Sequence, residues 1–197
     1  MFYGQRVVIR PMEREDMAFV QQLNADPAVR GRVVGWSWPQ SFAEQMSWFE
    51  SSRAGDSTHR WIVESREGTR IGLTGLWDVD WHNRNALTAL KLGGGPEVAG
   101  RGYGTDAIKA VMAFAFYDVG LERLYGSILE DNAASLRAYC DKAGWQQEGR
   151  ARRHVWRHGK WVDLLHVAAL RSDFETLRDA ADYRARIVAG GWAGEAP

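Results

Sequence analysis

The feature of this sequence that most limits its possible folds is a glycine-rich turn leading directly into a long amphipathic helix. Residues 100–105 read Gly-Arg-Gly-Tyr-Gly-Thr, and the helical pattern follows over 106–112. The first N–H groups of a helix lack partners within it and lie at the positive end of its dipole. Residues without side chains let an anion approach them closely. The sequence therefore predicts an anion site, with a phosphate-bearing cofactor as its first candidate ligand.

Two common phosphate motifs do not fit this turn. A dinucleotide fingerprint needs a third glycine where the chain has Thr105, and a P-loop needs Gly-Lys-Ser/Thr at the end of the loop. Taken alone, the turn is equally compatible with a phosphate site and with a glycine-rich cap of a helix.

A second segment, 132–145, reads as another helix, with Asn132 near its N-cap and Gly144 just past its C-terminus. Together the two segments resemble the GCN5-related N-acetyltransferase (GNAT) superfamily, and most closely its branch of ribosomal-protein N-terminal and spermidine acetyltransferases. The residues that match the motifs are Gly102, Gly104, Asn132, Ser135, Tyr139, Gly144 and Trp145.

The resemblance implies an α/β (α+β) fold with a mixed, mostly antiparallel sheet, whose fourth and fifth strands splay apart between flanking helices. Acetyl-CoA would fill that gap as co-substrate, with its pantetheine arm along 90–92 and its pyrophosphate on the glycine-rich turn. For Asn132, an N-cap and a direct coenzyme contact are both open, and the two can coexist. The implied coenzyme-binding residues are Leu90, Leu92, Gly100, Arg101, Gly102, Tyr103, Gly104, Thr105, Asn132 and Ser135.

The implied chemistry is direct acetyl transfer from a thioester to a primary amine. Tyr139 matches the family tyrosine that protonates the leaving thiolate, although it could also be a packing residue. A backbone N–H near Leu92 would stabilise the oxyanion. An acidic residue often found in relatives is replaced by Leu87, so a water chain led by Glu130, Asp80 or His82 is the candidate base.

The acceptor site in relatives is shaped by segments that here contain several tryptophans. Trp36, Trp38, Trp77 and Trp81 lie in or near them, and core packing explains most of the 10 tryptophans. Those that line a pocket would favour an apolar, cyclic or cationic amine. The acceptor is therefore either a small-molecule amine or a protein N-terminal amine. A non-catalytic acyl-CoA-binding sensor or assembly module of the same fold is the alternative function.

Composition fits one domain over 1–171 with a C-terminal helical extension over 172–197. This extension could pack on the body or on a second subunit, which makes a homodimer one possible assembly. The expected strands are 7–10, 61–64, 71–76, 87–92, 124–128, a segment near 155–156, and 162–170. The expected helices are 16–24, 42–51, the two motif helices and 172–188.

The 25 basic and 25 acidic residues balance, so no overall positive charge favours nucleic acid or an anionic membrane. A lone Cys140 and five histidines without ligand spacing predict neither a disulfide nor a metal. No signal peptide or membrane span is recognisable, and we expect a cytoplasmic protein.

Overall fold

The computed structural model describes residues 1–35, 39–51, 57–93 and 95–190. Its strands are β1 (Phe2–Tyr3), β2 (Val7–Pro11), β3 (His59–Ser65), β4 (Arg70–Asp80), β5 (Asn85–Leu92), β6 (Arg123–Leu129), β7 (Gln146–Arg157) and β8 (Lys160–Leu170). Its α-helices are α1 (Met17–Ala25), α2 (Pro27–Arg30), α3 (Phe42–Ser51), α4 (Tyr103–Ala113), α5 (Ala133–Leu136), α6 (Arg171–Glu175) and α7 (Ala180–Ala189). Shorter 3₁₀ or π segments are η1 (Arg14–Asp16), η2 (Gly95–Glu97), η3 (Phe114–Asp118) and η4 (Arg137–Asp141).

The strands form a single sheet in the order β1-β2-β3-β4-β5-β6-β8-β7. Every neighbouring pair is antiparallel except β5 and β6, which run parallel. Parallel neighbours need a crossover, and α4 supplies it. The mixed, mostly antiparallel α/β fold predicted from the sequence is confirmed.

The parallel pair opens into a split. Pairing between β5 and β6 stops after Leu87 and Tyr125. The strands are still close at the next position, because a Cβ added to Gly126 would lie 2.9 Å from the Thr88 carbonyl oxygen. Beyond it, β5 pairs only with β4, and β6 only with β8. With the short β1 counted as an extra strand, β5 and β6 are the splayed fourth and fifth strands that we expected.

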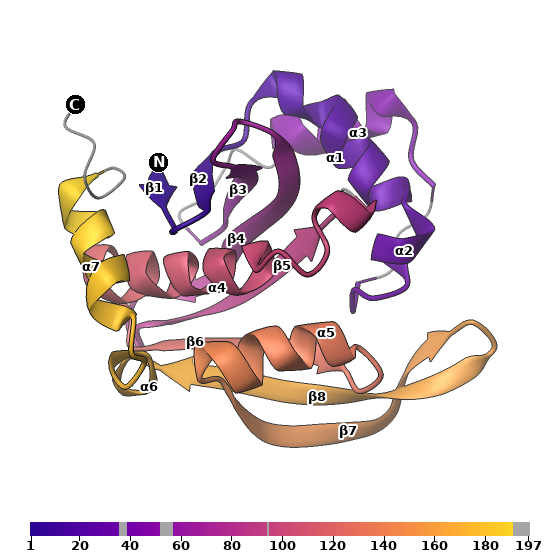
Figure 1. The fold of residues 1–197 in the computed structure, drawn as a ribbon. Helices are drawn as coiled ribbons and strands as arrows, with labels where there is room; N and C mark the ends of the chain where they lie inside the picture. The colour runs from indigo at the N-terminus through magenta and orange to yellow at the C-terminus, as the bar shows by residue number, and fades with distance from the viewer. Residues whose placement is uncertain (36–38, 52–56, 94, 191–197) are drawn as a thin grey trace.

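Helices cover the two faces of the sheet unequally (Figure 1). The largest core cluster lies between the sheet and α4 and includes Ile71, Leu76, Met112, Phe116 and Leu124. Residues 106–113 of α4 are all buried, not only the single face that the periodicity predicted. The reason is that α7 packs on the side of α4 that the sheet does not cover.

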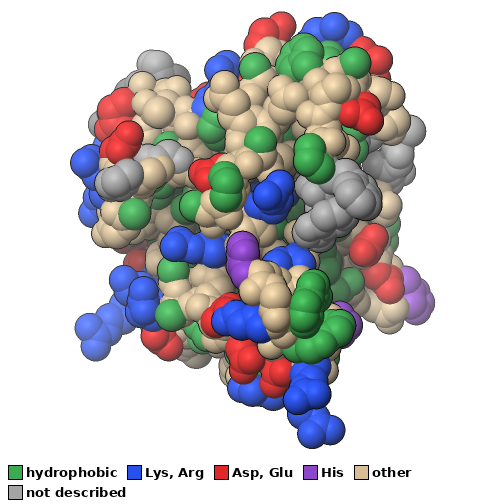
Figure 2. Space-filling view, turned by 90° about the vertical axis from the view of Figure 1, so that its right-hand side faces the viewer, with side chains coloured by type: hydrophobic (Ala, Val, Ile, Leu, Met, Phe, Trp, Pro, Cys, Tyr) green, Lys and Arg blue, Asp and Glu red, His purple; other side chains and the backbone are tan. Residues whose placement is uncertain are grey.

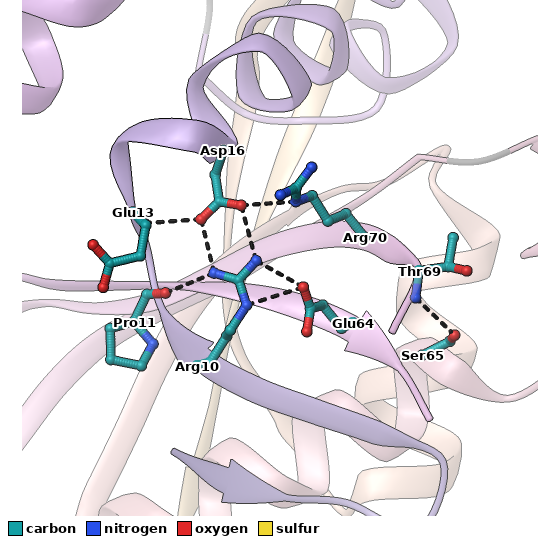
Figure 3. Close-up of polar contacts among 8 residues, drawn as sticks. All are labelled: Arg10, Pro11, Glu13, Asp16, Glu64, Ser65, Thr69 and Arg70. Carbon is teal, nitrogen blue, oxygen red and sulfur yellow. Dashed lines mark hydrogen bonds and ion pairs between the residues drawn. The ribbon is translucent and has the colours of Figure 1, made fainter. Parts of the chain in front are cut away.

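On the opposite face, α1 and α3 pack over Ile62 and Leu73. The start of α1 is fixed by the carboxylate of Asp16, which is 1% exposed and binds Arg10 through two hydrogen bonds of 2.8 Å (Figure 3). Arg70 Nε lies 2.8 Å from the same carboxylate, and Arg10 also reaches Glu64. This cluster joins β2, β3, β4 and η1, whose last residue, Asp16, is the N-cap of α1.

Two predicted helices differ from the structure. The helix expected over 172–188 is divided into α6 and α7, and its first residue is Arg171. Phe174 in α6 is completely buried, so the division lets the chain fill the core before α7 returns across α4. The second motif helix is only four residues of α-helix, α5, followed by the π-helical segment η4.

Candidate active site

The glycine-rich turn has an open surface at the N-terminus of α4. Gly100 and Gly102 have φ angles of 75° and 84°, a region that favours glycine, and Gly102 is the N-cap residue. A Cβ on Gly100 would meet nothing within 4 Å, and one on Gly102 only Arg6 Nε at 3.9 Å. The first bond of the helix runs from Asp106 N to Gly102 O, so the preceding amides lack helical acceptors. The turn can therefore accept an anion.

The inner edge of β5 supplies a second set of backbone groups. The Thr88 carbonyl points towards β6, whereas the Ala89 carbonyl accepts a hydrogen bond from Thr74 on β4. Because backbone direction alternates along a strand, Leu90 and Leu92 direct their N–H and C=O groups into the split. They have no pairing partner on β6, so an extended ligand can pair there as an added strand.

Tyr139 lies beside this split. It belongs to η4, is 9% exposed, and packs edge-on against Trp145 with ring centroids 4.9 Å apart. A cavity of about 10 Å³, roughly the size of one water molecule, separates it from the strands and is lined by Thr74, Thr88, Leu90, Ile108, Val111, Tyr139 and Trp145. Burial raises the pKa of the phenol, which gains no hydrogen bond within the described part of the chain.

Asn132 is the N-cap of α5, as one of the two interpretations predicted. Its Oδ1 accepts a hydrogen bond from Ser135 N at 3.2 Å, while its Nδ2 donates to the Arg32 carbonyl at 3.0 Å. The second bond ties the start of α5 to the segment that follows α2.

A connection that we did not predict from the sequence lies between residues 31–35 and the β7–β8 hairpin. Arg157 Nη2 donates to the carbonyl oxygens of Val33, Val34 and Gly35 at 3.3, 2.8 and 3.4 Å. Val34 packs against the core cluster under that hairpin. We call residues 31–35 the anchored loop. An arginine at the end of a strand carries no sequence signal for carbonyl oxygens 122 to 124 positions away.

The predicted acceptor-side residues do not gather in one place. Trp36 and Trp38 lie outside the described residues. Asp80 accepts hydrogen bonds from the amide and side chain of Asn83 in the β4–β5 turn, where His82 is exposed. These bonds lower the pKa of Asp80. Glu130 pairs with Arg150 at 3.1 Å. In that turn, Trp81 is 54% exposed, and Trp77 is half-buried on β4.

Comparisons with known proteins agree with this geometry. Residues 6–146 match the family described as acetyltransferase (GNAT) domain. The chain is 25% identical over 168 residues to spermidine N(1)-acetyltransferase of Escherichia coli (strain K12), covering 85% of this chain and 88% of that protein. It is 31% identical over 119 residues to a probable N-acetyltransferase of Bacillus subtilis (strain 168), covering 59% and 64%. Spermidine N-acetyltransferase from Vibrio cholerae, solved in complex with CoA and spermine, has a TM-score of 0.78 at 22% identity, covering 86% and 98%.

The match spans more than half of the chain, which therefore belongs to the GNAT acetyltransferase family. It is an acetyl-CoA-dependent N-acetyltransferase, as predicted. The relatives named above are all acetyltransferases and give no support to a non-catalytic sensor. Within the described ranges, no helix is long and apolar enough to span a membrane, and no cluster of His, Cys, Asp or Glu could hold a metal ion.

Proposed function

We propose that the acceptor is a primary amine on an uncharged or acidic molecule, either small or a protein N-terminus, rather than a polyamine. The relatives differ in this respect. One is named for spermidine and another as a putative ribosomal N-acetyltransferase from Bacillus subtilis (strain 168), 28% identical over 109 residues. The choice of acceptor therefore has to be argued from this chain.

The anchored loop leads directly to Trp36, in or near a segment that shapes the acceptor site in relatives, so we assign the loop to the acceptor side. The charge of this stretch supports the proposal. No Asp or Glu occurs from Pro27 to Ala43, a stretch that contains Arg30 and Arg32. A polycation needs carboxylates to replace the water around its ammonium groups. On the face turned to the viewer in Figure 2, the acidic and basic side chains of the described residues are intermixed.

The coenzyme would lie in the split between β5 and β6. In this proposal the amides of 102–105 hold the pyrophosphate, aided by the open surfaces of Gly100 and Gly102. Leu90 and Leu92 pair with the pantetheine amides, and Asn132 and Ser135 border the arm from the start of α5. The Leu92 N–H is our candidate oxyanion donor, an interaction typically worth ~3 kcal/mol.

Tyr139 would act as the general acid. The water-sized cavity places its ring beside Thr88 and Leu90, at the inner edge of the split. Because burial raises the pKa of its phenol, the group stays protonated throughout the physiological range and is always available as a donor. The thiolate that leaves the thioester is the base that it would protonate.

The proposal is tested by measuring coenzyme A release from acetyl-CoA with spermidine, phenethylamine and a short peptide with a free N-terminus. We expect phenethylamine or the peptide to exceed spermidine at least ~10-fold in kcat/KM. A preference for spermidine would contradict the acceptor class. The cytoplasmic location and the homodimer predicted from the sequence stay predictions, and a measured molar mass would decide the second.

A further inference from the structure

On the face of the sheet opposite α4, the described part of the chain leaves a strip of half-buried and exposed side chains beside the split. Side chains alternate along a strand. Leu124 and Ile128 of β6 face α4 and belong to its core cluster, so Tyr125 and Ser127 face the other way. We call Leu87, Ala89, Tyr125, Ser127 and His166 the open strip, because all five side chains are half-buried or exposed. By contrast, Thr88 and Gly126 between them are buried.

The open strip is where an acceptor amine can meet the thioester. The glycine-rich turn leads into α4, and α4 and Tyr139 both lie on the face of the sheet opposite the open strip. The leaving sulfur therefore belongs on the α4 face. A nucleophile must approach the carbonyl carbon from another direction, and the split gives access from the strip. Ser127 is two residues beyond Tyr125, the last β6 residue that pairs with β5.

The strip has no carboxylate, but it has an imidazole. His166 on β8 lies directly opposite Ser127 on β6, one strand spacing from the split, which is roughly 5 Å. Its Nδ1 is 3.2 Å from Ser127 Oγ. On its other side His166 is paired with Gly149 of β7, where a Cβ would make only an ordinary contact, 3.6 Å from His166 Cδ2.

We propose that His166 is the base that takes the proton from the acceptor ammonium, directly or through one water, and that Ser127 positions its ring. When Nδ1–H donates to Ser127 Oγ, Nε2 is left as the acceptor. The other candidates are poorly placed. Asp80 is held by Asn83, four residues before Leu87, the last β5 residue that pairs with β6. Glu130 is bound to Arg150.

The proton and electron balance is complete with these groups. Nε2 of His166 removes one proton from the ammonium, and the neutral nitrogen attacks the thioester carbon, placing an electron pair on the carbonyl oxygen. As that pair returns, the C–S bond breaks and Tyr139 protonates the sulfur. Tyr139 is reprotonated by the second proton of the nitrogen, through water, and His166 releases its proton to solvent.

The test uses two acceptors of nearly equal shape, phenethylamine and its β,β-difluoro analogue, whose amine is much less basic. The inference rests on amine acetylation, so wild-type protein must first release coenzyme A with either acceptor. Its inactivity with every amine would count against the proposed function itself. For His166→Gln we expect kcat/KM to fall ~100-fold with phenethylamine and less than ~5-fold with the analogue, with an unchanged KM for acetyl-CoA.

If His166 had only a structural role, His166→Gln would lower kcat/KM equally with both acceptors, and that result would overturn the proposal. Undiminished activity of the variant with phenethylamine would also overturn it. His166→Ala should recover activity on addition of imidazole, and failure of rescue in folded protein also counts against it. Ser127→Ala should lower kcat several-fold in the same acceptor-dependent way. The matched control is His154→Gln, an exposed histidine of β7 that should leave both rates unchanged.

Discussion

The phenol of Tyr183 in α7 donates a 2.6 Å hydrogen bond to Oδ1 of Asp106 in the first turn of α4. The same carboxylate accepts the backbone amides of Gln5, Arg6 and Val7 at 2.7, 2.7 and 3.0 Å. It is 4% exposed. Gly4 is required beside it, because a Cβ there would lie 2.3 Å from Oδ2. One buried carboxylate thus joins the N-terminal segment, α4 and the C-terminal extension.

Removing the Tyr183 hydroxyl tests this junction. Tyr183→Phe keeps the ring but leaves the carboxylate without one of its donors, and we expect a loss of about 2 kcal/mol in the free energy of unfolding. Chemical denaturation measures it. Tyr117→Phe is the control, because its hydroxyl reaches Glu175 only at 3.4 Å on the surface. Equal stability of both variants would show that the Asp106 bond contributes little.

The role of Tyr139 as proton donor predicts a separation of kinetic constants. Tyr139→Phe should lower kcat at least ~10-fold and leave coenzyme affinity almost unchanged, because the ring still packs on Trp145. Steady-state rates and calorimetric titration with coenzyme A give the two values. An unaltered kcat would remove Tyr139 from the mechanism.

The anchored loop predicts an effect on the acceptor alone. Arg157→Ala removes the donor to three loop carbonyls, so the loop should lose its fixed position. We expect the KM for the amine to rise ~5- to 20-fold while the KM for acetyl-CoA stays constant. Arg152→Ala, an exposed neighbour on the same strand, is the control. A change confined to acetyl-CoA would refute the assignment.

Asp16 predicts how stability depends on pH. Burial opposes its charge, but hydrogen bonds from Arg10 and the Glu13 amide outweigh burial and hold the pKa of the carboxyl below its ordinary value. A lowered folded-state pKa contributes stability above the unfolded pKa, near ~3.9, and loses it as pH falls through the folded value.

Asp16→Asn should therefore cost about 3 kcal/mol at neutral pH and show a weaker loss of stability below ~pH 4. Urea unfolding at several pH values measures both effects. Glu15→Gln, an exposed acid in the same turn, should change neither. Parallel pH curves for wild type and Asp16→Asn would contradict the assigned role.

Local patterns in the sequence predicted most of the fold. The α3 helix was predicted with its observed bounds, and the glycine-rich turn leads into α4 as its pattern indicated. Long-range partners were not predictable. Nothing near Arg157 signals carbonyl oxygens more than 120 residues earlier, and the Ser127–His166 pair depends on the β6–β8 register. The division of 172–188 follows from packing of Phe174, which periodicity does not encode.

Gly102 links the turn to coenzyme binding. Gly102→Val should weaken coenzyme A binding at least ~10-fold, because a side chain would cover the amides and oppose a φ of 84°. Gly159→Val imposes the same strain at a φ of 78° in the distant β7–β8 turn and should not affect binding. Equal affinities of the two variants would show that the turn does not hold the coenzyme.

The most direct test of the coenzyme site is a titration followed by ¹H–¹⁵N correlation spectra of the wild-type protein. With ADP, which carries the diphosphate, we expect the largest amide shifts at 102–105. With pantetheine we expect them at Leu90 and Leu92, and with coenzyme A at both. Coenzyme A that binds while leaving the amides of 102–105 unshifted would contradict the account.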